Sequence, residues 1–400
     1  MRRSTHFVQF VLAALIVMIL GGLVGWYVFV QRAIDSTTAN DNARGFNTDP
    51  TFGSQTGSFL QNASEAGIAE SAPNSAAPRL WRVAANPTAG AGFIASTTRV
   101  FFVERSSGNV LTADPATQAI ARLTNTLIPQ VYEAYFSSGG AVALRSIKDG
   151  AVTTLVAPLS AAESNVQALL GVQLPIDVLS LSPARDDIVF LVQNGAGAAL
   201  MRSNWSGQSA RLILSLPLSS WIVMRSHDGS VFIAQRPSDG AAGYAYRVTD
   251  AGGLVPLVQN VAGLTISPRS ANGPVLYGSS EGGLLSLSLL PTPLAEPIHL
   301  TLRTSADKCV WARSTRAIAY CAVPRVPSTG PALDERSQGI LHTADAWWRI
   351  DGVTGETELL FSPPSDVAID VERPLIDEKS GTIVFMNRTD KSLWMLRITE

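Results

Sequence analysis

A repeated pattern of four short apolar runs, each closed by turn residues, constrains the fold of this chain more than any other sequence feature. The pattern is clearest in residues 176–218, where the runs cover 178–181, 188–192, 198–203 and 210–216. Short runs of Val, Ile, Leu and Phe bounded by Gly, Asp, Asn or Ser-Pro predict strands joined by tight turns. Four such strands within about 40 residues form an antiparallel meander the size of one β-propeller blade.

Similar meanders account for most of the chain from residue 79 onward. Residues 79–400 divide into about seven candidate blades, and blade counts of six and eight are the alternatives. The last candidate blade is one strand short, and the segment RLWRVA at residues 79–84 can supply its outer strand. Such closure removes the exposed sheet edges that would otherwise template aggregation. We therefore expect an all-β fold, a β-propeller of about seven four-stranded blades closed by an N-terminal strand.

Two of these hairpins carry a family resemblance. The segments LSLSPARDDIVFLV and LTISPRSANGPVLYG resemble degenerate copies of the TolB-type, WD40-like repeat, in which Ser-Pro-Asp-Gly joins two strands. The Asp-Gly is replaced by residues 184–186 in the first copy and by residues 269–270 in the second. The resemblance covers residues 79–400 and implies the propeller fold. The chain also resembles uncharacterised bacterial membrane-anchored propellers that carry KCVW and YCAVP before a long insertion.

The N-terminal segment is predicted to span a membrane. Residues 7–30 contain only one strongly polar residue, Gln9, and as a helix they would extend about 36 Å, enough for a hydrocarbon core of about 30 Å. Two arginines precede this segment, so the positive-inside rule places residues 1–6 in the cytoplasm and the rest of the chain outside. A cleaved signal peptide is the alternative, although its apolar core would normally be only about 7–15 residues long.

Between the predicted helix and the predicted propeller, residues 31–78 are rich in Ser, Thr, Asn, Ala, Gly and Pro. A segment with so few large apolar side chains buries too little surface to offset its ordering entropy. We expect a flexible linker here. The predicted organisation is a cytoplasmic N-terminus, a transmembrane anchor, a linker and an extracytoplasmic propeller, at residues 1–6, 7–30, 31–78 and 79–400.

Charge and motifs exclude several functions. A net charge of −2 without a basic run gives no electrostatic basis for binding nucleic acid. Gly278–Gly282 fits G-x-S-x-G, but the hydrolase elbow needs a following helix and here another strand follows. Ser305 and Lys308 fit S-x-x-K, which also needs a helix and further partners. No spaced ligand cluster predicts a metal and no motif predicts a cofactor. We therefore expect no enzyme activity.

The only two cysteines, Cys309 and Cys321, lie on the two halves of CVWARSTRAIAYC. If the turn is centred near Thr315, they face each other across a hairpin, close enough for a disulfide. An exported domain lies where disulfides persist. The alternative is two buried free thiols at unrelated registers.

One irregularity interrupts the repeat array, an insertion at residues 324–346 between the second and third strands of the sixth blade. Long loops in compact domains are often functional. In propellers, the loops between the second and third strands share a face with the connections between blades, and that face commonly binds partners. We predict a binding surface here. The alternative is a solvated loop, with Trp347 and Trp348 packed between blades. The residues of the predicted surface are Leu333, Arg336, Leu341, His342, Trp347 and Trp348.

These features together favour a single-pass protein of the bacterial cell membrane whose exported propeller is a non-catalytic binding or scaffolding module at the cell envelope. Its expected partner is a protein or an envelope polymer, besides the membrane itself. The rival hypothesis is an envelope hydrolase or lyase acting on glycan or peptide, with its site in the propeller channel. A third hypothesis is a structural spacer that assembles into larger complexes.

Overall fold

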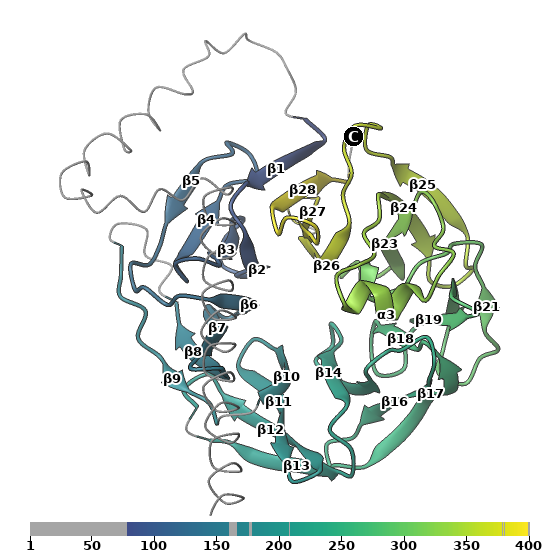
Figure 1. The fold of residues 1–400 in the computed structure, drawn as a ribbon, viewed down its shortest axis with the longest axis horizontal. Coiled ribbons are helices and arrows are strands. Elements are labelled where there is room, and N and C mark those ends of the chain that lie inside the picture. The colour runs from purple at the N-terminus through teal and green to yellow at the C-terminus, as the bar shows by residue number, and fades with distance from the viewer. Residues whose placement is uncertain are drawn as a thin grey trace, which may run out of the picture. The chain divides into compact units, whose positions relative to one another are not determined.

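The computed structural model describes residues 78–159, 166–175, 178–207, 209–377, 379 and 381–398. Seven antiparallel sheets of four strands each surround a common centre in this part of the chain (Figure 1). The expectation of a seven-bladed all-β propeller is therefore confirmed. The predicted anchor at residues 7–30 and the linker up to residue 77 lie outside the described residues. Among the residues that are described, no helix is long and apolar enough to cross a membrane.

Each blade is a meander whose strands follow one another from the centre of the ring outward. The first three blades are, in that order, β2 (Thr88–Phe93), β3 (Val100–Glu104), β4 (Val110–Ala113) and β5 (Ile120–Arg122); β6 (Val131–Ser137), β7 (Ala141–Lys148), β8 (Ala151–Pro158) and β9 (Val172–Gln173); and β10 (Val178–Pro183), β11 (Asp187–Asn194), β12 (Gly197–Asn204) and β13 (Arg211–Leu216).

The next three blades continue this order without interruption. They are β14 (Trp221–Arg225), β15 (Val231–Gln235), β16 (Ala242–Val248) and β17 (Leu254–Ala262); β18 (Thr265–Pro268), β19 (Val275–Glu281), β20 (Leu284–Leu290) and β21 (Ile298–His299); and β22 (Cys309–Trp311), β23 (Ile318–Pro324), β24 (Asp345–Asp351) and β25 (Thr357–Phe361). A short 3-10 helix η1 (Ala306–Lys308) precedes β22, and helix α3 (Ala332–Ser337) lies between β23 and β24.

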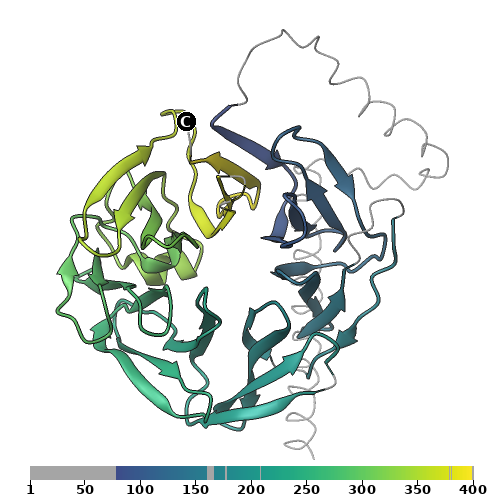
Figure 2. The same ribbon diagram turned by 180° about the vertical axis from the view of Figure 1, so that it is seen from behind.

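The seventh blade closes the ring with strands from both ends of the described chain. It consists of β26 (Val371–Asp377), β27 (Thr382–Asn387), β28 (Leu393–Arg397) and, outermost, β1 (Leu80–Ala84). Strand β1 pairs antiparallel with β28, with Leu80 opposite Leu396 and Trp81 opposite Met395. The views from the front and from behind both show this neighbouring pair (Figures 1 and 2). The predicted closing strand is thus confirmed.

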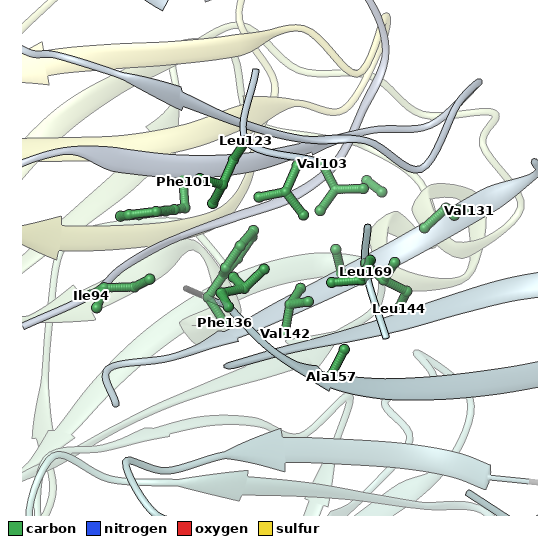
Figure 3. Close-up of a cluster of buried hydrophobic side chains, with 14 residues drawn as sticks. Ile94, Phe101, Val103, Leu123, Val131, Phe136, Val142, Leu144, Ala157 and Leu169 are labelled. Atoms are coloured by element: carbon green, nitrogen blue, oxygen red, sulfur yellow. The ribbon is translucent and has the colours of Figure 1, made fainter. Parts of the chain in front are cut away.

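The core consists of seven apolar clusters, one between each pair of neighbouring blades. The strands are covered on both faces, so their apolar runs are continuous rather than alternating. In β11, Ile188 and Phe190 pack towards the second blade, whereas Val189 and Leu191 pack towards the fourth. Figure 3 shows the cluster between the first two blades, in which Phe101 lies 6.2 Å from Phe136 between ring centroids.

Glycine permits a close approach of the innermost strands at one of these borders. A Cβ added at Gly90 in β2 would lie 2.1 Å from the carbonyl oxygen of Ala134 in β6, and one at Gly92 would lie 2.4 Å from Cβ of Phe136. Only glycine leaves room for this contact. In the second blade, the described residues 166–170 are not helical, and Gln167 forms a β-bridge with Thr124.

Candidate functional site

The innermost strands surround a central cavity of about 670 Å³. Apart from Leu393 at the start of β28, its lining comes from the first or second strand, or the turn between them, of all seven blades. It combines apolar and aromatic side chains with a set of charged ones. Besides Tyr135, the charged and ionisable side chains of the lining are Arg185, Arg225, His227, Asp228, Arg269, Arg313 and Arg373. Five arginines thus face the cavity against a single carboxylate.

Four of these arginines are placed by the same kind of turn. Arg185, Arg225, Arg269 and Arg313 lie in or at the edge of the hairpins that join the first and second strands of blades three to six. Because all innermost strands run in the same direction through the ring, these hairpins lie at one end of the cavity. The tight turns follow from the local sequence, which has Ser-Pro before two of them and Asp-Gly in another.

The four arginines differ in how far their charge is compensated. The side chain of Arg225 is only 8% exposed, and its guanidinium lies 2.8 Å from the carboxylate of Asp187. Arg269 donates a 2.6 Å hydrogen bond from Nη2 to the carbonyl oxygen of Ser314, and its buried Nε has no partner among the described residues. Arg185 is 71% exposed and lies 3.9 Å from a carboxylate, a weak surface contact. Arg313 is exposed and forms no ion pair with the described residues.

The fifth arginine belongs to the innermost strand of the last blade. Arg373 adopts φ +52°, where β26 is irregular, and its guanidinium carbon lies 4.0 Å from the ring centroid of Tyr135 in β6. Burial by itself would lower the pKa of Arg373, but Tyr135 and two nearby glutamates raise it above its usual value. Burial also raises the pKa of Tyr135, although Arg373 opposes this effect. The pair therefore places a fixed positive charge on an aromatic wall.

The single carboxylate that lines the cavity is held in place by its own turn. One oxygen of Asp228 accepts hydrogen bonds from Ser226 Oγ at 2.6 Å and from the Ser230 amide at 3.1 Å. The other accepts a 2.9 Å bond from the amide of Ala271 in the next hairpin. Burial alone would raise the pKa of Asp228, but these bonds hold it below its usual value. Asp228 is therefore a structural anion, poorly suited to proton transfer near neutral pH.

The insertion packs onto the ring through its helix. Asp239, in the loop between β15 and β16, accepts hydrogen bonds from the amides of Leu333 and Asp334, both at 2.9 Å. This carboxylate at the start of α3 satisfies two amides that the helix itself leaves free. Leu333 is 6% exposed, and its side chain lies next to Gly263.

Arg336 fixes the other side of α3, which lies near β26 (Figure 1). Its Nη1 donates to Ser305 Oγ at 3.1 Å and to the Asp307 carboxylate at 2.8 Å, while Nη2 donates to the carbonyl oxygen of Val371 at 3.4 Å. Burial would lower the pKa of Arg336, but the charge of Asp307 raises it. This arginine therefore joins the insertion to blades six and seven.

The remaining residues of the predicted surface occupy different environments. Trp347 is 1% exposed and packs against Phe385, with 5.2 Å between ring centroids, in the cluster between blades six and seven. Trp348 is half-buried on the opposite side of β24, next to the cluster between blades five and six. Leu341 is half-buried and His342 is exposed. The structure thus does not gather the six residues on one face, and their contact with a partner stays a prediction.

The two cysteines are opposite each other in the pairing of β22 with β23. In the structure they form a disulfide with an S–S distance of 2.05 Å and a Cα–Cα distance of 4.0 Å. Cys309 also lines the cavity. Gly278 to Glu281 lie in β19 and lead directly into a hairpin turn, so no helix follows the serines of the G-x-S-x-G string. No group of three or more described His, Cys, Asp or Glu residues could hold a metal ion.

Sequence reasoning missed the arginines of the cavity. Each of the four hairpin arginines is unremarkable alone, and the chain as a whole is slightly acidic. The available signal was their recurrence, one per blade, in the turn after the first strand. Blade positions must be known before this recurrence is visible.

The fold and the cavity define a seven-bladed β-propeller with an arginine-lined centre. No known family model and no curated protein matches the chain. Solved structures do resemble it. An oligogalacturonate lyase in complex with manganese is 12% identical with a TM-score of 0.52, over 80% of this chain and 93% of that one. The β-propeller domain of Myceliophteria thermophila Cps50 (Swd1) is 8% identical with a TM-score of 0.52, over 80% and 100%.

A putative TolB from Agrobacterium tumefaciens is 10% identical over 56% of this chain and 84% of that one, with a TM-score of 0.40. The resemblance to WD40-like propellers is confirmed at the level of the fold by the Cps50 domain. At such identities the likeness concerns the fold alone, because one fold supports many functions.

Proposed function

We propose that the chain is a non-catalytic binding module of the cell envelope. The central cavity carries this proposal. Its volume of about 670 Å³ lies within the usual range of ligand pockets, and its walls combine apolar surface with a few convergent charged groups. The arginines keep their charge at any physiological pH, and the aspartate has a lowered pKa. Such groups bind and orient a ligand, whereas proton transfer needs a group that titrates near the working pH.

The proposed location rests on the sequence. Residues 7–30 are long and apolar enough for a membrane helix that keeps residues 1–6 in the cytoplasm and exports the propeller. A disulfide between Cys309 and Cys321 suits an extracytoplasmic site, because cytosolic thiols are kept reduced. A flexible linker at residues 31–78 would let the module reach a protein or polymer partner away from the bilayer.

A second contact surface at the insertion belongs to the same proposal. Of the residues predicted there, His342 is exposed and Leu341 and Trp348 are half-buried, so these three can contact a partner without rearrangement. Leu333, Arg336 and Trp347 hold the insertion in place. They would support such a surface from below.

The rival proposal, an envelope hydrolase or lyase, is favoured by one residue. His227 lines the cavity among the arginines, and histidine is the side chain that ordinarily titrates near neutral pH. An enzyme of this kind would lose turnover on glycan or peptide in His227→Gln, whereas a binding module would retain its ligand.

Capture of a partner tests the binding proposal. The tagged 400-residue chain is incubated with envelope extract beside Ser138→Trp, which places a bulky side chain in the cavity lining. Ser215→Trp, on the exposed outer strand β13, is the matched control. We expect the wild type and Ser215→Trp to capture the same molecule and Ser138→Trp to lose it. Failure of the wild type to capture anything, or equal capture by all three, would overturn the proposal.

A further inference from the structure

We propose that the ligand of the cavity is an organic anion carrying at least two carboxylate or phosphate groups, bound chiefly by Arg269 and Arg313. The inference rests on the proposed function, in which the central cavity is the binding site. It adds the chemistry of the ligand and names two residues that recognise it.

The first argument is the imbalance of charge. The chain has a net charge of −2, yet five arginines and one aspartate line the cavity. Asp187 lies 2.8 Å from Arg225 and offsets that charge, while the carboxylate of Asp228 accepts three hydrogen bonds within its own turn and from the next hairpin. Like charges around a partly enclosed space repel one another more strongly than in bulk water. An anionic ligand removes this repulsion.

The second argument is that two neighbouring arginines have guanidinium donors without a partner among the described residues. Arg269 uses Nη2 in a bond to the carbonyl oxygen of Ser314, and its Nε is buried without a partner among the described residues. Ser314 directly follows Arg313, so the fifth and sixth blades bring the two arginines to adjacent hairpins. Arg313 is exposed and forms no ion pair with the described residues. One guanidinium can hold one carboxylate or phosphate with two parallel bonds, so this arrangement suits two anionic groups on one ligand.

The third argument concerns the rest of the ligand. The cavity wall includes aromatic and aliphatic side chains, among them Phe93, Phe136 and Trp311. The guanidinium of Arg373 lies over Tyr135 on the same wall, which adds a positive charge beside an apolar surface. An inorganic ion would leave this surface in water, so an inorganic probe tests only the contacts to the arginines. An anion with a carbon skeleton would cover it, which is favourable because apolar area is removed from water.

Titration calorimetry tests the inference with simple probes. The purified 400-residue chain is titrated at constant ionic strength with citrate and with pyrophosphate, and with acetate and inorganic phosphate as the single-group counterparts. We expect citrate, pyrophosphate or both to bind at least about tenfold more tightly than their counterparts, because charged hydrogen bonds form at two arginines instead of one. Preference for citrate would indicate carboxylates, and preference for pyrophosphate would indicate phosphates. Absence of binding by both would overturn the inference.

Variants assign the contacts. Arg269→Gln/Arg313→Gln is expected to weaken binding of the tighter probe by at least about tenfold. Arg122→Gln/Arg211→Gln removes two exposed arginines from the outer strands β5 and β13 and is expected to change binding by less than about twofold, since those charges are distant and screened. Equal binding by the Arg269 and Arg313 double variant and the wild type would overturn the inference.

Two further measurements separate misfolding and functional failure from a wrong ligand class. Arg313→Gln alone breaks no hydrogen bond or ion pair seen in the described residues. It should therefore lower the affinity for the tighter probe while leaving the melting temperature unchanged. Arg313→Lys should restore part of the affinity, because the charge remains. If Ser138→Trp abolishes capture from envelope extract while the double variant retains it, the binding function stands and the anionic ligand is rejected. If the wild type captures nothing, the proposed function itself is rejected.

Discussion

The ammonium nitrogen of Lys308 lies 2.7 Å from a carboxylate oxygen of Asp370, and the two side chains are only 3% and 0% exposed. The same nitrogen lies 2.7 Å from Asp345 and donates to Thr343 Oγ1 at 2.7 Å. These three contacts use the three donors of the ammonium group. Lys308 directly precedes β22, while Asp370 directly precedes β26, so the cluster joins blade six, blade seven and the end of the insertion.

Replacement of Lys308 by methionine is expected to destabilise the chain by about 3–5 kcal/mol, because two buried carboxylates lose their common partner. The free energy of unfolding in urea measures this effect. Lys148→Met, at an exposed position at the end of β7, is the matched control and should change stability by less than about 0.5 kcal/mol. Equal stability of the two variants would show that the buried cluster contributes nothing.

The same cluster predicts a loss of stability in acid. Burial by itself would raise the pKa of Asp370, but the charge and hydrogen bond of Lys308 hold it below its ordinary value of 3.8. A carboxylate whose pKa is lower in the folded chain stabilises the fold above its unfolded pKa, and this contribution disappears as the pH falls through the folded pKa. The melting temperature should therefore decrease as the pH is lowered below about 4. Asp370→Asn should be less stable at neutral pH and show a flatter acid profile, whereas parallel profiles would contradict the assignment.

The disulfide between Cys309 and Cys321 is expected to stabilise the fold by restricting the unfolded chain. For a sequence separation of 12, loop-closure entropy predicts a contribution of about 3 kcal/mol, less any strain. Urea unfolding of the wild type with and without reductant measures it. The variant Cys309→Ala/Cys321→Ala should match the reduced wild type and be insensitive to reductant. An oxidised wild type no more stable than this variant would contradict the prediction.

Much of the propeller could be predicted from the sequence because its signals are local. Hairpins such as β18–β19 are bounded by turn residues that fix each strand, and the shortage of one strand in the last blade pointed to residues 79–84. The opposition of Cys309 and Cys321 follows from the centre of a single turn. Each of these inferences needs only neighbouring residues and the period of a strand.

The cavity and the insertion contacts could not be predicted in the same way because they depend on blade placement. Arg269 and Arg313 become neighbours only when successive blades share a centre. Lys308 meets Asp370 across 62 residues of chain. Asp239, two blades before the insertion, accepts hydrogen bonds from backbone amides in the first turn of α3. A polar residue in a loop carries no local sign of such a partner.

The role of Trp347 decides how the insertion is interpreted. Its indole is 1% exposed and packs against Phe385 between blades six and seven, so Trp347→Ala should destabilise the fold by about 3–5 kcal/mol. His342→Ala, at an exposed position five residues after the end of α3, should change stability by only about 0.5 kcal/mol. Urea unfolding of both variants, followed by capture from envelope extract, separates packing from binding. A stable Trp347→Ala variant that loses its partner would show that this tryptophan contacts the ligand directly. Loss of the partner in His342→Ala at unchanged stability would place the contact on the exposed part of the insertion.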